Sequence, residues 1–138
     1  VDLARERFGL DVLHLTVEEW TPGWEGMAAA VPMTEALVSG QRDRYRRWDW
    51  LQNDWAQEVA PDPAKCWVVE GCGTLTPTTK KHADLAVWVE AEPQVAKARG
   101  LARDGEAYAP FWRVWNEQER RHWESHRPRD LADVIVET

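Results

Sequence analysis

A chain of 138 residues has the length of one domain and can bury a substantial hydrophobic core. Its net charge of −7 argues against general binding to nucleic acid or to an anionic membrane surface, because both need a basic face. No apolar run approaches the roughly 18 residues that span a bilayer, and the N-terminus lacks a signal-peptide pattern.

The chain has two cysteines, Cys66 and Cys72, and they are too far apart along one expected strand to bridge each other. Without further cysteines we expect neither a disulfide nor a cysteine-based zinc site. This composition favours a reducing compartment, and we therefore expect a cytoplasmic protein.

The N-terminal part of the chain predicts a helix, a strand, a loop and a second helix. Residues 1–9 have the pattern of the last turns of an amphipathic helix that stops at a glycine. Residues 11–17 are rich in leucine and β-branched residues, which predicts a strand, and residues 18–26 are dense in turn residues. Residues 27–39 have a helical pattern, and we expect that helix to start near Pro32, because proline fits a first helical turn.

The middle of the chain is less regular. We expect residues 42–54 to be irregular, with a short strand at 45–48, and residues 60–64 to form a connector because they hold two prolines. Residues 65–70 predict a strand, and residues 75–81 predict a loop or a short helix.

The stretch 66–73 is an apolar run followed by Glu70 and two glycines. A run of this kind, bounded by turn signals, predicts a strand buried on both faces. In open α/β sheets the carboxyl ends of strands are where ligands bind, so Glu70 is a candidate site residue. A core strand that ends in a surface glutamate is the simpler alternative.

The C-terminal part predicts two strands and two helices. Residues 84–90 predict a strand, and a helix should run from Pro93 to about Arg103. Residues 107–126 predict the longest helix, because its aromatic residues recur at spacings of three and four. Residues 131–136 predict a last strand. Strands that alternate with helices indicate βαβ units and a mainly parallel sheet.

Two groups of arginines could bind an anion. Arg99 and Arg103 lie four residues apart on one helical face, where two guanidinium forks suit a phosphate group in transfer. A solvated face paired with nearby carboxylates is the alternative. Residues 42–47 hold the only basic cluster, interleaved with aromatic residues. This cluster could bind an anionic or aromatic ligand, or its arginine stems could cover apolar surface.

Two further pairs of residues have side chains that could act in catalysis or bind a metal. Glu18 and Glu19 follow the first expected strand, where carboxylates can act as a general base or hold a metal, or simply form a solvated turn. His122 and His126 share a helical face at a spacing that can bind zinc. Because we find no third strong ligand, we favour a structural role for the histidines.

Five segments carry a resemblance to a known family. Residues 18–26 read Glu-Glu-Trp-Thr-Pro-Gly-Trp-Glu-Gly, and residues 44–50 read Arg-Tyr-Arg-Arg-Trp-Asp-Trp. A Val-Val-Glu-Gly motif occupies residues 68–71, an Arg-x3-Arg-Asp-Gly pattern occupies residues 99–105, and residues 108–136 hold the final helix and strand. In this order and spacing, the chain resembles P-loop kinases of the uridine kinase-like group, among the nucleoside and nucleotide kinases.

The resemblance implies that residues 1–138 form a single domain, a three-layer α/β sandwich of the P-loop NTPase type. It also implies that the protein transfers a phosphoryl group from ATP and uses Mg²⁺. It implies that Glu18 is the catalytic base, and that Arg99 and Arg103 clamp the transferring group. Glu70 would lie near Mg²⁺ and its waters. The implied acceptor pocket is lined by Trp20, Arg46, Arg47 and Asp49. These residue types suit phosphoryl transfer, which depends mostly on positioning and charge neutralisation.

The sequence departs from the family at two points. Glutamate replaces aspartate at both 18 and 19, and the extra methylene displaces a base by roughly 1 Å, which can cost on the order of 100-fold in rate. The 138 residues also contain no G-x-x-x-x-G-K-[ST] motif, the loop that cradles phosphates. The family places this loop, with the central strand of its sheet, before the helix at residues 1–9.

The central strand of the family lies between the strands at 65–70 and 84–90. Its absence would leave two backbone edges unpaired inside the core, at a cost of several kcal/mol. Upstream residues beyond this sequence could supply the strand, the two flanking strands could close into a four-stranded sheet, or a second chain could supply it. We favour the first arrangement.

Two hypotheses from different classes follow. The first is a cytoplasmic ATP-dependent phosphotransferase that acts on a small hydroxylated or phosphorylated acceptor. The second is a non-catalytic, kinase-like remnant that binds a ligand or a protein partner. The sequence leaves the identity of the acceptor and the oligomeric state open, a homo-oligomer included.

Overall fold

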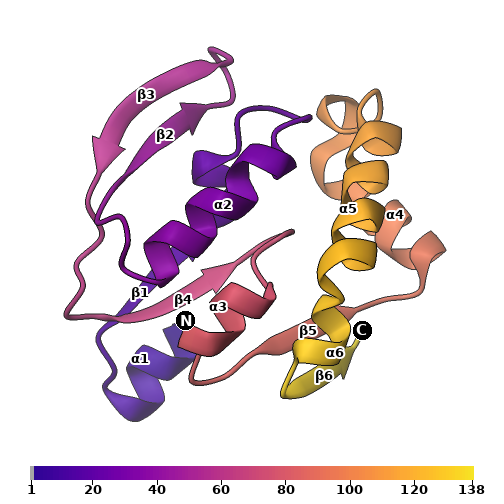
Figure 1. Ribbon diagram of the computed structural model, residues 1–138. Helices are drawn as coiled ribbons and strands as arrows, with labels where there is room; N and C mark the ends of the chain where they lie inside the picture. The colour runs from indigo at the N-terminus through magenta and orange to yellow at the C-terminus, as the bar shows by residue number, and fades with distance from the viewer. Residues whose placement is uncertain (1) are drawn as a thin grey trace. The chain divides into compact units, whose positions relative to one another are not determined.

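The computed structural model describes residues 2–138, which form two compact units, one ending at Thr74 (unit 1) and one beginning at Leu75 (unit 2) (Figure 1). The fold is mixed α/β, with three two-stranded sheets among the described residues. Two of the three are parallel. The three-layer sandwich and the single kinase-like domain stay predictions.

Residues 2–74 of unit 1 contain three helical segments and four strands. They are α1 (Asp2–Phe8), β1 (Val12–Thr16), the 3-10 helix η1 (Val17–Trp20), α2 (Met27–Val38), β2 (Tyr45–Asp49), β3 (Asp54–Val59) and β4 (Cys66–Glu70). Strands β1 and β4 pair in parallel, with Thr16 opposite Glu70, so both strands end at the same edge. The predicted strands at 11–17, 45–48 and 65–70 are confirmed.

The hairpin of β2 and β3 is antiparallel, with an irregularity between Arg46 and Trp48. Its turn contains Asn53 at φ +52°, a left-handed conformation that asparagine tolerates better than most residues. Strand β3 was not predicted, because most of its residues are exposed and the sequence therefore lacks an apolar alternation.

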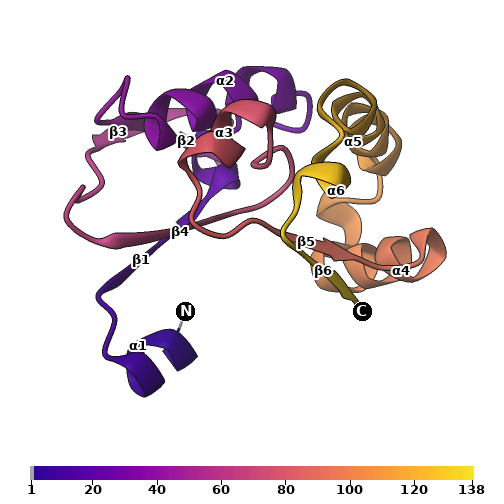
Figure 2. The ribbon, with the colours of Figure 1, turned by 60° about the horizontal axis from the view of Figure 1, so that its bottom comes forward.

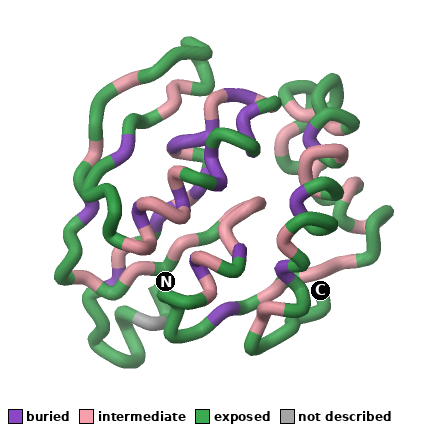
Figure 3. Tube along the Cα trace, viewed as in Figure 1, coloured by how far each residue is buried: buried purple, intermediate pink, exposed green. Residues whose placement is uncertain are grey.

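The core of unit 1 forms where η1 packs between β1, α2 and the start of β2. Its buried hydrophobic residues are Leu15, Val17, Trp20, Ala30, Leu37 and Tyr45. Figure 3 shows buried positions recurring along α2. Trp20 is 2% exposed, and its Nε1 donates to Thr34 Oγ1 at 2.9 Å. Its ring lies 4.8 Å from that of Tyr45, so one side chain joins three elements.

Helix α2 begins at Met27, so the predicted start near Pro32 is wrong. The backbone N–H groups of Ala29 and Ala30 already donate to the Gly26 carbonyl, which closes the first turn before the proline. Pro32 lies inside the helix on an exposed face. The Ala28 carbonyl that loses a partner there is on an exposed residue and can bind water.

Unit 2 contains five helical segments and two strands. They are α3 (Pro77–His82), β5 (Val87–Glu90), α4 (Pro93–Asp104), the 3-10 helix η2 (Gly105–Ala107), α5 (Trp112–His126), α6 (Pro128–Leu131) and β6 (Val134–Glu137). Strands β5 and β6 pair in parallel, with Glu90 opposite Glu137. Figure 2 gives a second view of these segments.

Of the two long helices of unit 2, one prediction is confirmed and one needs correction. Helix α4 ends as predicted, where Gly105 takes φ +54°. Helix α5 begins at Trp112 rather than at residue 107, because Pro110 lacks the N–H that a continuous helix needs and the preceding residues form η2 and turns.

Asp133 anchors the start of β6: it accepts from the Ala86 backbone N–H and from Lys80 Nζ.

Strand β4 is not buried on both faces, which contradicts the sequence prediction. Its residues alternate between exposed and half-buried, and Val68 is 40% exposed. Within the described part of unit 1 the strand pairs with β1, and Cys66, Val68 and Glu70 on one of its faces are exposed. No described helix has the length and apolar character needed to cross a bilayer.

The hydrogen bond from Trp20 to Thr34 yields a stability prediction. Thr34→Val keeps the side-chain shape but leaves the buried indole N–H without its acceptor, and we expect a loss of about 1–3 kcal/mol in the free energy of unfolding. Thr16→Val, at a half-buried residue of the same unit, is the control and should change stability by less than about 0.5 kcal/mol. Urea unfolding measures both, and equal losses would refute the role of this bond.

Candidate functional site

Two carboxylates lie at the carboxyl edge of the β1–β4 pair in unit 1. Glu70 is the last residue of β4, and Glu18 follows the end of β1 by two residues, in η1. A Cβ atom placed on Gly71 would lie 3.5 Å from Glu18 Oε2, so the Glu18 carboxylate reaches the turn that follows Glu70. The parallel register therefore brings these two predicted site residues to one edge of unit 1.

Glu70 is paired with His14, across the two strands. His14 Nε2 lies 3.2 Å from Glu70 Oε1, and both side chains are about half exposed. A carboxylate in this position can contact a hydrated cation, the role expected for Glu70 beside Mg²⁺. Among residues 2–138 no group of three or more metal-ligating side chains comes together.

Gly71 holds the turn after β4 close to η1. Its φ is +123°, and a Cβ atom there would lie 2.3 Å from Val17 Cγ1. Only glycine avoids both the strained backbone and this clash. The second half of the Glu-Gly motif is therefore required for packing against the segment that carries Glu18.

The β2–β3 hairpin holds η1 from the other side. Trp50 Nε1 donates to the Glu18 carbonyl at 3.0 Å, and the Tyr45 hydroxyl donates to Glu19 Oε2. Burial, together with the hydrogen bond to the Glu19 carboxylate, raises the pKa of Tyr45 well above its usual range. Of the two neighbouring carboxylates, Glu19 is thus committed to the hairpin and Glu18 remains exposed.

The residues predicted to line the pocket for the phosphoryl acceptor lie in different environments. Trp20 is a core residue with 2% of its surface exposed, which favours a packing role. Asp49 Oδ1 accepts from the backbone N–H groups of Leu51 and Gln52, both at 2.9 Å, and so shapes the hairpin turn. Arg46 Nε donates to a carbonyl of β3 at 3.0 Å. Arg47 instead lines a pocket beside β1.

Arg99 and Arg103 belong to helix α4 of unit 2, and their guanidinium groups contact different partners. Arg99 donates to the hydroxyl and carbonyl oxygens of Thr138, at 3.0 and 3.3 Å. Arg103 donates to both carboxylate oxygens of Asp104, which holds the pKa of Asp104 below its usual range. The side chain of Arg103 is 79% exposed, so this pair is weak and exchangeable.

His122 and His126 are adjacent on α5, with ring centroids 4.6 Å apart. His122 is buried, and its Nε2 lies 3.2 Å from the Leu75 carbonyl oxygen. Its burial and this contact give His122 a structural role in the core of unit 2.

Sequence reasoning did not identify His14, Tyr45, Trp50 or Gly71 as residues that support the site. Their contacts join positions 26 to 56 residues apart, and no local pattern shows such pairs. Only the Glu-Gly step was visible, as a turn signal after an apolar run. No family model matches the chain, and no curated protein matches it.

Tyr45 provides a test of the contact between η1 and the hairpin. In a Tyr108→Phe background Tyr45 is the only tyrosine, so ultraviolet absorbance near 295 nm reports its ionisation. We expect titration well above the ordinary value near 10, and Glu19→Gln should lower the pKa while burial keeps it above that value. Because the folded-state pKa is raised, the corresponding stability is present below about pH 10 and is lost as pH rises further.

Glu18→Gln is the matched control for this titration, because its carboxylate is not the partner of the Tyr45 hydroxyl. It should leave the Tyr45 titration unchanged. An ordinary pKa for Tyr45, or an equal response to both substitutions, would contradict the described contact.

Gly71 provides a second test. Gly71→Ala adds a methyl group that collides with Val17, whereas Gly40→Ala adds one at φ +78° with no atom within 4 Å. The control should cost about 1–2 kcal/mol for its backbone conformation alone. Gly71→Ala should cost about 1–3 kcal/mol more, because the packed neighbour must move. Urea unfolding separates the two, and equal losses would show that the turn relaxes freely.

Proposed function

We propose that the chain acts in ATP-dependent phosphoryl transfer to a small hydroxylated or phosphorylated acceptor, as a cytoplasmic kinase of the P-loop type. The observation that carries the proposal is the register of β1 with β4, which brings Glu18 and Glu70 to one carboxyl edge of a parallel pair. Ligands of open α/β proteins bind at such edges. The resemblance of five ordered motifs to uridine kinase-like proteins supports the same reaction.

Glu18 is the proposed general base. Its exposed carboxylate would accept the proton of the acceptor hydroxyl, while the backbone bond from Trp50 and the Gly71 turn keep η1 in place. The neighbouring Glu19 cannot take this role without losing its bond to Tyr45. The two glutamates thus have different roles although they are adjacent in the sequence.

The residues present fit Mg²⁺ in one respect and do not fit ATP by themselves. Glu70 offers an exposed carboxylate that would hold water of a hydrated Mg²⁺, and such an ion neutralises phosphate charge when bound. The 138 residues contain no phosphate-cradling motif, so ATP binding requires a loop from other residues. The phosphate clamp proposed from the resemblance alone is Arg99 and Arg103 of unit 2, which contact Thr138 and Asp104 at exposed positions.

The competing proposal is a kinase-like domain that binds its ligand without catalysis. It is favoured by the lack of a phosphate loop within these residues and by glutamate in place of aspartate at position 18. The two proposals differ in one measurable quantity, turnover of MgATP in the presence of an acceptor that binds.

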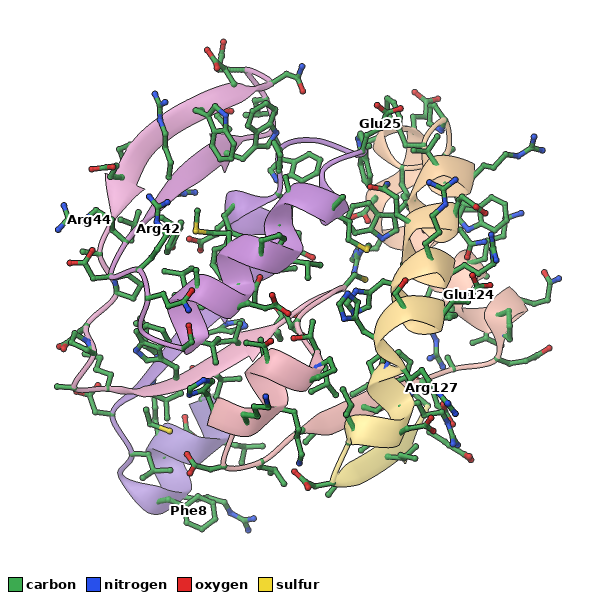
Figure 4. All side chains as sticks on the ribbon, in the orientation of Figure 1. Phe8, Glu25, Arg42, Arg44, Glu124 and Arg127 are labelled. Atoms are coloured by element: carbon green, nitrogen blue, oxygen red, sulfur yellow. The ribbon has the colours of Figure 1, made fainter. Side chains whose placement is uncertain are left out.

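Glu18→Gln tests the kinase proposal. The parent protein for this test carries, besides these residues, a phosphate-cradling loop. With MgATP and a panel of nucleosides, nucleotides and sugars, its ADP release should be acceptor-dependent, and at least about 100-fold slower in the variant because the base is lost. Acceptor affinity should change little, since the amide keeps the size of the carboxylate. Glu25→Gln, at an exposed carboxylate farther along the same loop, is the control and should retain the rate (Figure 4).

Two results would overturn the kinase proposal. Full activity of Glu18→Gln would remove this residue as the base. Acceptor binding without any ADP release by the parent protein would favour the non-catalytic domain.

A further inference from the structure

A pocket of about 410 Å³ lies beside β1 within unit 1. Its walls come from residues 13–15 of β1, from Tyr45 and Arg47 of β2, and from the segment that runs from Val59 to Lys65. Its volume falls within the range of small-molecule sites, about 300–1,000 Å³. Neither Glu18 nor Glu70 lines it, so it is separate from the proposed catalytic edge.

One part of the pocket lining is apolar. Leu13 and Leu15 contribute from β1, and Val59 and Pro61 contribute from the end of the hairpin. These side chains are buried or half-buried, so they form a supported surface rather than isolated exposed groups. A ligand that fits here needs an apolar body to replace water along this surface.

The carboxylates that line the pocket already have partners. Glu19 Oε2 accepts from the Tyr45 hydroxyl, and Asp62 Oδ1 accepts from the Ala64 backbone N–H at 2.9 Å. Their oxygens are therefore partly satisfied within unit 1. This reduces their need for a cationic ligand.

The cationic side chains that line the pocket differ in whether they have a partner within unit 1. Lys65 pairs with Asp11 at 3.4 Å, and His14 contacts Glu70. Among the described residues, Arg47 forms no ion pair or hydrogen bond, although it lines the pocket. Arg47 is exposed, and its charge acts on the neighbouring Tyr45 hydroxyl. A guanidinium fork beside an apolar wall can bind a carboxylate or phosphate group bidentately.

We propose that this pocket binds a small amphipathic anion, with one carboxylate or phosphate group held by Arg47 and an apolar body lying along Leu13, Leu15 and Val59. Tyr45 and Arg47 both line the pocket; Tyr45 is buried, and Arg47 is exposed at the irregularity of β2 between Arg46 and Trp48. Arg47 thereby has a role different from the acceptor contact expected from the sequence. The binding reaction involves no phosphoryl transfer, so its failure and the failure of the proposed kinase activity are distinguishable.

Four probes test the proposal by calorimetric titration of the full chain. Octanoate and octyl phosphate carry both an anionic group and an apolar body, octanol carries only the body, and acetate carries only the charge. We expect saturable binding of one or both amphipathic anions, at least about tenfold tighter than octanol or acetate. The tighter of the two identifies carboxylate or phosphate as the preferred group.

Arg47→Gln should weaken binding of the preferred anion at least about tenfold, and Arg47→Lys should recover part of the loss because it keeps the charge without the fork. Arg42→Gln removes the same charge from the neighbouring segment, outside the pocket, and should change the Kd less than twofold (Figure 4). Circular dichroism checks that each variant is folded. Equal weakening by Arg42→Gln, equal affinity for octanol, or no saturable binding of either anion would overturn the proposal.

Discussion

The indole of Trp20 is the contact on which the rest of unit 1 depends. Its ring packs against Tyr45 and its N–H is held by Thr34, so η1, α2 and the hairpin meet at one buried side chain. A buried indole without an acceptor is costly, so the hydroxyl of α2 determines how η1 docks. The position of η1 in turn places Glu18 and Glu19 at the edge of β1. Fold and candidate site thus share one packing constraint.

That constraint assigns different environments to two chemically identical neighbours. Glu19 faces Tyr45 and is bound by its hydroxyl, which couples the carboxylate to the core. Glu18 faces the turn at Gly71, and the hairpin contacts its backbone rather than its carboxylate. A group used as a base must be held in position while its oxygens remain accessible, and this arrangement provides both.

The sequence predicted those elements whose signal is local. The strands at β1 and β4 and the helix α4 were found because apolar runs, proline and glycine mark their ends. The start of α2 was missed because a proline in a first turn and one on an exposed later turn look the same in sequence. Of the candidate site, the sequence indicated Glu18 and Glu70, because each lies in a recognisable motif. Its supports, His14, Tyr45 and Trp50, act through long-range contacts that no local pattern encodes.

The edges of β4 and β5 change the energetic argument about a central strand. The cost of several kcal/mol expected for unpaired backbone groups applies only where those groups are buried away from water. Val68 of β4 is 40% exposed and Val89 of β5 is 61% exposed. Parallel strands are usually buried on both faces. The exposed valines of β4 and β5 therefore leave room for further elements to cover these strands. The two-stranded pairs are therefore compatible with both proposals for the function.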